Sequence, residues 1–341
     1  MRITILALSL FLAGCSDRGP TPATSGPRLS ASLAARWPTA KAARQAVFTP
    51  DGKIAAFSDA SGTIELRDTH GWKVVERLDH PGGATALAFT RDGTHLFSGG
   101  YDGTIREWDL ARRGQVRVLR AKGATIWTVD LSPDGKRIAA AGEDAIIRIW
   151  DLDRQSPPAE LRGHTRNIWE VRFSPDGKRL ASCSFDYSVR LWDARQARLL
   201  KTLNGHKQSC VGLDYSPDGK LIASGGDDST IRYWRASDGT PLRTVDNGRH
   251  VDKVTFSRDG QWLASGGHPH GMIGEFWHQV TGGGGGDGDA VRLWRTSDGA
   301  LVAGLPHPDD VYYVAFSPDG RWLVTSGEDN GFRLWTLRAH D

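Results

Sequence analysis

The sequence has little sulfur and little net charge. Its 341 residues include two methionines and three cysteines, and the formal net charge is only +3. Lys and Arg are mixed with Asp and Glu along the chain, so it has none of the concentrated basic patches that binding to a phosphate backbone requires. We therefore expect no nucleic-acid partner.

Long helical patterns and common catalytic motifs are also missing. No stretch has the apolar period of a long amphipathic helix. The sequence contains no Gly-x-Ser-x-Gly elbow, no phosphate-cradling glycine loop and no His-Glu-x-x-His pair. These absences argue against the enzyme classes that use those motifs, and we expect no cofactor.

Tryptophan and glycine, by contrast, are abundant. Thirteen Trp and 41 Gly are typical of an all-β protein with rigid aromatic cores and many tight turns. The composition, 39% hydrophobic and 24% charged, is that of a soluble globular protein. A chain of this length could hold two average domains, but all-β domains often reach it by repetition.

The first 14 residues, MRITILALSLFLAG, have the organisation of an export signal. Arg2 precedes a largely apolar run from Ile3 to Leu12, which is about half the ~20 residues needed to cross a bilayer as a helix. The Leu-Ala-Gly-Cys sequence ending at Cys15 resembles the lipoprotein box of bacterial exported proteins. An ordinary cleaved signal and a misassigned start are the alternatives.

The lipoprotein resemblance implies cleavage before Cys15 and lipidation of that cysteine. Because Ser16 follows, and not an aspartate, it also implies an outer-membrane anchor facing the periplasm if the cell is Gram-negative. The segment 15–28 is rich in Pro, Gly, Ser and Thr and has no apolar period, so we predict a flexible tether. Its root-mean-square reach is roughly 20 Å.

One short motif recurs seven times along the rest of the chain. Its copies are FTPDGK, FTRDGT, LSPDGK, FSPDGK, YSPDGK, FSRDGQ and FSPDGR, beginning at Phe48, Phe89, Leu131, Phe173, Tyr215, Phe256 and Phe316. Successive copies are 41, 42, 42, 42, 41 and 60 residues apart, so only the sixth interval departs from the period. Such a period indicates a repeat architecture.

Each repeat carries the signals of several short strands. An Asp-Gly pair between apolar runs predicts a β-hairpin, because glycine adopts the positive φ that the turn requires. The second strand, such as RLASCS, is followed by an acidic turn, a third strand such as SVRLWD and a fourth such as LLKTLNGH. Four antiparallel strands make one propeller blade, so residues 29–341 are predicted to form an all-β, seven-bladed β-propeller.

The repeats resemble the WD-repeat β-propeller family. The resemblance rests on REWD, RIWD and RLWD, ending at Asp109, Asp151 and Asp193, and on the Gly-His pairs at His164 and His206. In that family a loop histidine, a strand serine or threonine, a turn aspartate and a third-strand tryptophan form a hydrogen-bonded network inside each blade. The matching residues, for which the resemblance implies a structural role, are His80, Ser98, Asp102, Trp108; His164, Ser182, Asp186, Trp192; His206, Ser224, Asp228, Trp234; and His307, Thr325, Asp329, Trp335.

Two repeats depart from this pattern at two positions each. The first has Ser61 in place of the aspartate and Arg67 in place of the tryptophan, so its blade is expected to be the least stable. The third has Lys122 and Ala140 in place of the histidine and the serine.

The last repeat ends without a fourth strand. It stops after GFRLWTLRAHD, whereas RLSASLAARWP (Arg28–Pro38) precedes the first repeat at the fourth-strand position. An unpaired sheet edge risks pairing with another chain. We therefore predict that the N-terminal segment completes the seventh blade and closes the ring as a monomeric propeller.

The resemblance also implies where partners bind. Family propellers use mainly the face at which the loops before the first strand and after the second strand emerge, and two positions of each repeat are predicted to be exposed there. One set is Arg44, Thr85, Trp127, Trp169, Val211, Asp252 and Tyr312, and the other is Tyr101, Glu143, Phe185, Asp227 and Glu328. Aromatic residues with acidic neighbours are the composition of an interaction hot spot. Packing of several of these rings between the blades is the alternative.

The sixth interval contains an insertion at residues 268–286, on the same face of the propeller. The sixth repeat keeps Ser265 and Trp294, but its histidine and aspartate are out of register. Residues of types that bind Zn²⁺ are His268, His270, Glu275, His278, Asp287 and Asp289. Their spacing matches no rigid motif, and five consecutive glycines make their ordering costly in entropy, so we predict no metal site. The insertion is instead predicted to be either a partner-contact loop bearing Met272, Phe276 and Trp277 or a passive loop with no binding role.

Two cysteines, Cys183 and Cys210, fall in adjacent repeats. Export would permit a disulfide, but a bridge needs Cα atoms within about 7 Å. Both residues occupy strand positions that are usually small and buried, so we expect two inert thiols, with a disulfide as the alternative.

The sequence thus predicts a non-enzymatic, membrane-anchored scaffold of the bacterial cell envelope that binds other proteins on the propeller face. The alternative is an envelope enzyme or metal-binding protein with its site at the channel mouth and the 268–286 insertion. A convergent cluster of acid, base or metal-ligating groups beside the channel would favour the alternative. An aromatic rim without such a cluster would favour the scaffold.

Overall fold

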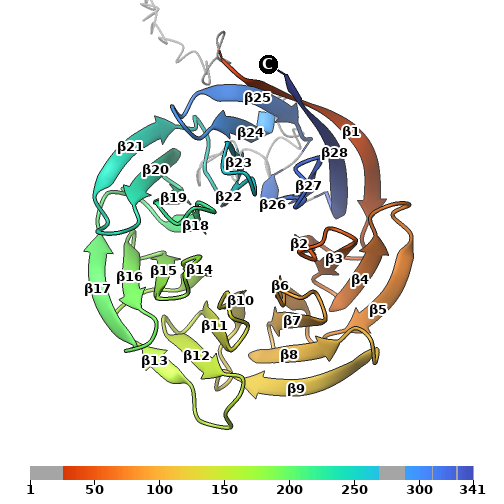
Figure 1. Ribbon diagram of the computed structural model, residues 1–341, viewed down its shortest axis with the longest axis vertical. Coiled ribbons are helices and arrows are strands. Elements are labelled where there is room, and N and C mark those ends of the chain that lie inside the picture. Colours follow the sequence, from red (N-terminus) through yellow and green to blue (C-terminus); the bar gives the residue numbers. More distant parts are fainter. Residues whose placement is uncertain (1–25, 269–288, 309, 328, 341) are drawn as a thin grey trace, which may run out of the picture.

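Seven antiparallel sheets are arranged in a ring (Figure 1). The computed structural model describes residues 26–268, 289–308, 310–327 and 329–340. Within these ranges the chain forms 28 strands, four to each sheet. The predicted all-β, seven-bladed propeller is confirmed.

In the first three blades the strands are arranged in chain order. The first strand of each blade lies nearest the centre of the ring and the fourth lies at the outer edge (Figure 1). Blade one is β2 (Ala43–Phe48), β3 (Ile54–Asp59), β4 (Thr63–Asp68) and β5 (Val74–Asp79). Blade two is β6 (Ala84–Phe89), β7 (His95–Gly100), β8 (Thr104–Asp109) and β9 (Gly114–Arg120). Blade three is β10 (Ile126–Leu131), β11 (Arg137–Gly142), β12 (Ile147–Asp151) and β13 (Ala159–Leu161).

The next three blades have the same order. Blade four is β14 (Ile168–Phe173), β15 (Arg179–Ser184), β16 (Val189–Asp193) and β17 (Arg198–Leu203). Blade five is β18 (Cys210–Tyr215), β19 (Leu221–Gly226), β20 (Thr230–Arg235) and β21 (Pro241–Asp246). Blade six is β22 (Lys253–Phe256), β23 (Trp262–Gly266), β24 (Asp289–Arg295) and β25 (Leu301–Pro306), so DAVRLW belongs to an ordinary third strand, as expected.

The seventh blade joins the two ends of the chain. It contains β26 (Val311–Phe316), β27 (Trp322–Gly327), β28 (Gly331–His340) and, as its outer strand, β1 (Arg28–Pro38). β1 runs antiparallel to β28, from Arg28 opposite His340 to Pro38 opposite Gly331, and Figure 1 shows it on the outside of the ring. The predicted closure by the N-terminal segment is confirmed.

The Asp-Gly turns set the hairpin between the first two strands of every blade. Their glycines have φ between 67° and 72°, the left-handed region that a residue with a side chain adopts only with strain. In the fourth copy, Asp176 accepts hydrogen bonds from Ser174 Oγ at 2.6 Å and from the backbone N–H of Lys178 at 3.0 Å. The recurring motif is therefore a turn in which the aspartate side chain accepts hydrogen bonds from the backbone and from a neighbouring hydroxyl group.

The hydrophobic core lies between neighbouring blades. Trp192 of blade four packs in one cluster with Ile147 and Ile149 of blade three, and the equivalent Trp234 packs with Leu191 of blade four. Trp192 and Trp234 are 1% and 2% exposed, so each blade covers the next. This sequential packing explains why the ring needs all seven blades to bury its core.

Blade one has its own aromatic cluster where the other blades have a third-strand tryptophan. The Arg67 guanidinium lies 4.9 Å from the centre of the Trp37 ring and pairs with Glu65 at 2.6 Å. Trp37 also contacts Phe57 and Trp72, with ring centres 5.5 and 5.1 Å apart. The predicted lower stability of this blade remains a prediction, but packing and ion pairing take the place of its missing network.

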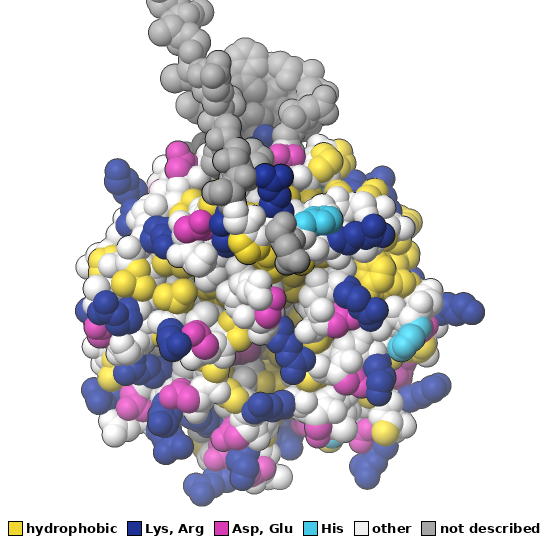
Figure 2. All heavy atoms as spheres, turned by 45° about the horizontal axis from the view of Figure 1, so that its top comes forward, with side chains coloured by type: hydrophobic (Ala, Val, Ile, Leu, Met, Phe, Trp, Pro, Cys, Tyr) yellow, Lys and Arg dark blue, Asp and Glu magenta, His cyan; other side chains and the backbone are white. Residues whose placement is uncertain are grey.

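No helix within residues 26–268, 289–308, 310–327 and 329–340 is long and apolar enough to cross a membrane. On the side of the ring that Figure 2 shows, Lys and Arg side chains are interspersed with Asp and Glu. The charges on this side therefore do not gather into a patch of one sign.

Candidate functional site at the channel mouth

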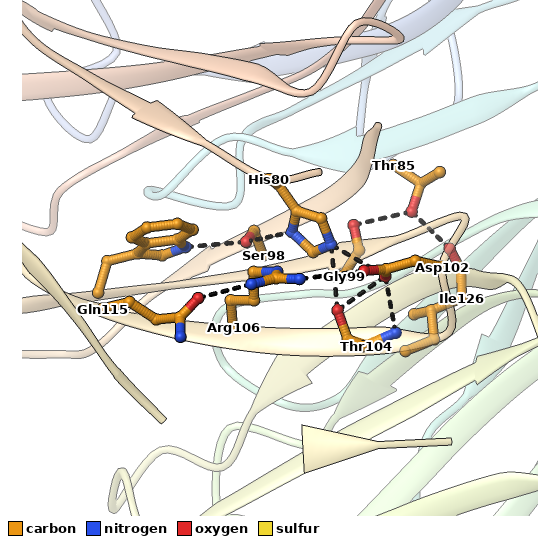
Figure 3. Close-up of polar contacts among 10 residues, drawn as sticks. His80, Thr85, Ser98, Gly99, Asp102, Thr104, Arg106, Gln115 and Ile126 are labelled. Carbon is orange, nitrogen blue, oxygen red and sulfur yellow. Dashed lines mark hydrogen bonds and ion pairs between the residues drawn. The ribbon is translucent and has the colours of Figure 1, made fainter. Parts of the chain in front are cut away.

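Histidine, serine, aspartate and tryptophan form hydrogen-bonded networks inside the blades (Figure 3). In blade two, Trp108 Nε1 donates to Ser98 Oγ at 2.9 Å, and Ser98 Oγ lies 2.8 Å from His80 Nδ1. The other ring nitrogen of His80 lies 3.2 Å from Asp102 Oδ1. The sets containing His164 and His206 make the same contacts at 2.7–3.0 Å.

The electrostatics of these networks agree with a structural role. Burial lowers the pKa of His80 and of His164, so the neutral rings are favoured at neutral pH. Although burial acts in the opposite direction, hydrogen bonds from Thr104 and His80 lower the pKa of Asp102 to about 2. The neutral rings and the ionised carboxylate are therefore the forms that the blade networks favour.

Two blades build the network with different residues. In blade seven, Trp335 Nε1 donates to Thr325 Oγ1 at 3.0 Å, while Arg333 bonds to His307 and pairs with Asp329 at 2.6 Å. In blade six, Ser265 Oγ donates to Asn247 Oδ1 at 3.0 Å. Asn247 and Arg333 were not predicted, although Asn247 precedes Ser265 by the same 18 residues that separate His80 from Ser98.

The predicted partner-binding positions lie on one face of the ring, which we call the upper face and define as the face where each first strand begins. In six blades the first of these positions coincides with a β-bulge, a break in register that re-aims a side chain. Trp127, for example, falls between the paired residues Ile126 and Thr128, and Trp169 falls between Ile168 and Glu170. Five of the six bulged side chains line the cavity at the channel mouth, and the exception is Val211.

Four of the predicted aromatic side chains form a continuous row, which we call the aromatic row: Tyr101, Trp127, Trp169 and Phe185. The Trp127 and Trp169 rings stack with centres 5.1 Å apart, and Trp169 stacks on Phe185 at 5.4 Å. Tyr101 meets the edge of Trp127 at 5.6 Å, and the Arg44 guanidinium lies 5.7 Å from the Tyr101 ring. The row extends across blades two, three and four.

A cavity of about 230 Å³ opens beside the aromatic row. Its lining combines residues from six first strands: Arg44, Gln45, Thr85, Ala86, Trp127, Thr128, Trp169, Glu170, Asp252, Lys253, Tyr312 and Tyr313. Trp127 Nε1 and Arg44 Nε are buried there and have no hydrogen-bond acceptor among the described residues. The mouth thus combines apolar ring surface with polar atoms that are left to bind something else.

The predicted partner-binding positions differ in how exposed their side chains are. Arg44, Thr85, Trp127, Trp169, Asp252, Tyr312, Tyr101, Phe185 and Asp227 are half-buried, and Glu143 is exposed. Val211 is 4% exposed, so its predicted exposure is wrong. A Cβ on the adjacent Gly212 would lie 2.8 Å from the backbone nitrogen of Val254, which shows how closely blade six packs on this edge of blade five.

Several predicted residues lie outside the described ranges. These are Cys15, Glu328, His270, Glu275, His278 and Asp287, and the insertion residues Met272, Phe276 and Trp277. Cys183 and Cys210 are described, and both are free and buried in one core cluster. Burial raises the pKa of the Cys210 thiol, which makes it a poor nucleophile.

A layer of ion pairs and hydrogen bonds lies in the wall of the cavity beside the aromatic row. Glu170 lies 2.5 Å from Lys253 Nζ and 2.6 Å from Arg172, and Gln45 donates to the Tyr313 hydroxyl at 2.6 Å. Burial raises the pKa of Asp130 to about 6 on the opposite side, where a second cavity of about 290 Å³ opens. This layer was not predicted, although charged residues inside apolar first strands such as WEVRF are its sequence signal.

A second group of side chains lies on the upper face between blades five and six. Asp227 follows β19, His250 and Asp252 precede β22, and His268 follows β23. His250 Nδ1 lies 3.6 Å from Asp227 Oδ1, and His268 Nε2 lies 3.7 Å from Asp252 Oδ1. Burial raises the pKa of Asp252 to about 7, and its Oδ2 is buried without a donor among the described residues. An aromatic rim and a convergent cluster are therefore both present.

Six segments of the chain match the family model for the WD domain, G-beta repeat. They are residues 72–109, 113–151, 155–193, 197–235, 239–270 and 299–336, which together cover more than half of the sequence. The chain belongs to the WD-repeat family. The strands of blade one before residue 72 lie outside the matches, in agreement with the departures at Ser61 and Arg67.

Two curated WD-repeat relatives match part of this propeller. Transcription factor unc-37 of Caenorhabditis elegans is 42% identical over 69 residues, which are 20% of this chain and 11% of that protein. Protein groucho of Drosophila melanogaster is 31% identical over 96 residues, which are 28% of this chain and 13% of that protein. The chain spans only a small part of the length of either relative.

Proposed function

We propose that this WD-repeat propeller is a non-enzymatic scaffold that is anchored in the bacterial cell envelope and captures another protein on its upper face. The observation that carries the proposal is the aromatic row beside the cavity. Stacked aromatic rings at a concave mouth provide a large apolar contact area at low cost in side-chain entropy.

The acidic residues around the row suggest the charge of the partner. Glu143 is exposed on this face, and Asp227 is half-buried on the same rim. Carboxylates on a rim attract cationic side chains and disfavour anionic ones. We infer that the partner presents an Arg or Lys side chain to this acidic rim beside the aromatic row.

The capture experiment uses the full chain anchored in membranes. The Trp127→Ala/Trp169→Ala variant should lose at least about tenfold in affinity for the captured protein, because two central aromatic contacts are removed. Leu199→Ala, which truncates a side chain that is 40% exposed on the outer strand β17, is the matched control and should keep its affinity. Unchanged capture by a folded double tryptophan variant would refute the role of the row.

The anchor is proposed from the sequence of the first 15 residues. The wild-type chain should incorporate a labelled fatty acid and sediment with membranes, whereas Cys15→Ser should do neither. A labelled Cys15→Ser protein, or an unlabelled wild-type protein, would contradict lipidation while leaving the capture experiment valid.

The cluster between blades five and six favours a second candidate function, which is metal binding. Two imidazoles and two carboxylates converge there, at the edge of the cavity lined by Asp252.

A further inference from the structure

We propose that Asp227, His250 and His268 form a binding site for a late first-row divalent metal ion, represented by Zn²⁺, on the rim between blades five and six. One possible ligand atom from each of the three side chains lies within 4.8 Å of the others. Two ligands about 2.0–2.1 Å from Zn²⁺ at a tetrahedral angle lie roughly 3.3 Å apart. Metal binding at this site therefore requires rotations of these half-buried side chains.

The fold brings the three ligands together from separate parts of the chain. Asp227 lies in the turn after β19 of blade five, His250 in the connection to blade six, and His268 directly after β23. The two imidazole rings are 4.6 Å apart between centres, and the Asp227 carboxylate faces His250 at 3.6 Å. Neither histidine belongs to a blade network, where the ring nitrogens contact serine and aspartate.

The surroundings favour a cation. Asp252 has a side chain that is 13% exposed, and its Oδ1 lies 3.7 Å from His268 Nε2. Its Oδ2 is buried and accepts no hydrogen bond from the described residues. A carboxylate beside a metal-binding histidine orients the ring and offsets the positive charge of the ion, which is a common feature of zinc sites.

The ligand types determine the class of metal. Two imidazole nitrogens with one carboxylate suit Zn²⁺ and its late first-row neighbours, whereas Mg²⁺ and Ca²⁺ prefer sites made wholly of oxygen. Three protein ligands leave a fourth position open. Because Asp252 also lines the cavity, that position lies near the proposed partner-binding surface.

The site differs from the zinc cluster considered from the sequence. That cluster combined His268 with residues of the insertion, whereas Asp227 and His250 come from outside the insertion and are placed by the two blades. His268 is the one residue that belongs to both clusters.

The test measures Zn²⁺ binding to the full chain after treatment with a chelator. Titration with Zn²⁺ alone should show one equivalent bound, with neither Mg²⁺ nor Ca²⁺ competing at millimolar concentration. Asp227→Asn and His250→Ala should each weaken binding by more than about 100-fold, since loss of even an outer partner of a metal ligand costs roughly 10- to 100-fold. Bound Co²⁺ should give the visible absorption of a four-coordinate site, which both variants should lose.

Matched variants separate this site from other histidines. His70→Ala removes an exposed histidine of blade one and should bind Zn²⁺ as the wild type does. His270→Ala/His278→Ala should also retain binding. Asp227→Asn should melt at the wild-type temperature without metal, so its loss of binding would not reflect unfolding.

Two results would overturn the proposal. One is a wild-type chain that binds no stoichiometric Zn²⁺. The other is binding that survives Asp227→Asn and His250→Ala but disappears in His270→Ala/His278→Ala. Neither result affects capture by the aromatic row, so this inference and the scaffold function fail independently.

Discussion

Histidine and aspartate occur in two settings in this propeller. Inside blade four, His164 lies 2.8 Å from Asp186 on one side and 2.7 Å from Ser182 on the other. On the rim between blades five and six, His250 and His268 instead face carboxylates at 3.6 and 3.7 Å. The same residue types are structural where each polar atom has a close partner within the blade, whereas on the rim they form the metal site that we propose.

The largest expected effect concerns β1, which pairs with β28 and closes the ring. Deleting residues 29–37 should lower the free energy of unfolding by about 5 kcal/mol, because the seventh blade loses a whole strand and the buried Leu29 side chain. Thermal melting measures the loss. Deleting the tether residues 17–24 is the control and should leave melting unchanged. An unaltered melting curve for the first deletion would contradict closure by β1.

A smaller effect separates the two kinds of tryptophan. Trp192→Ala should cost about 3–5 kcal/mol of stability, because it empties a core position and removes the donor to Ser182. Trp169→Ala should cost about 1 kcal/mol, because that ring is half-buried and mainly stacks on its neighbours. Urea unfolding of the two variants gives both values. Equal losses would mean that the aromatic row is core and not binding surface.

The smallest effect is a pH dependence of the blade networks. Since burial lowers the pKa of His164 below 6.5, the folded state favours the neutral ring. Its contribution is complete above about pH 6.5 and is lost as the pH falls through the lowered value. The melting temperature should therefore decline below pH 6.5. His164→Gln should flatten that decline, and a decline of equal size in this variant would assign it to other groups.

The repeats predicted the fold because they encode it locally. The seven Asp-Gly motifs fix the hairpins, and the match of Arg28–Pro38 to the missing strand fixes the closure. The hydrogen-bonded histidines follow from the same register. Asn247 was not predicted, because the family pattern has a histidine at that position and this blade uses an amide.

The upper face was harder to predict, because its properties depend on contacts between blades. The register placed Trp127 and Trp169 correctly, but it did not show that their rings stack or that Val211 is covered. The cluster of Asp227, His250 and His268 combines residues from two repeats. Their spacing in the sequence matches no local metal-binding motif. Such clusters become visible only when neighbouring blades are placed together.

The pairing of β1 with β28 also has a consequence for the order of folding. Arg28 contacts His340, so the ring closes through one of the longest loops that the chain can form. Blades two to five contain only neighbouring segments, so each can form from a local stretch of the chain. The strand β1 can pair only after β28 has been synthesised. Closure of the ring is therefore the last step in the folding of this propeller.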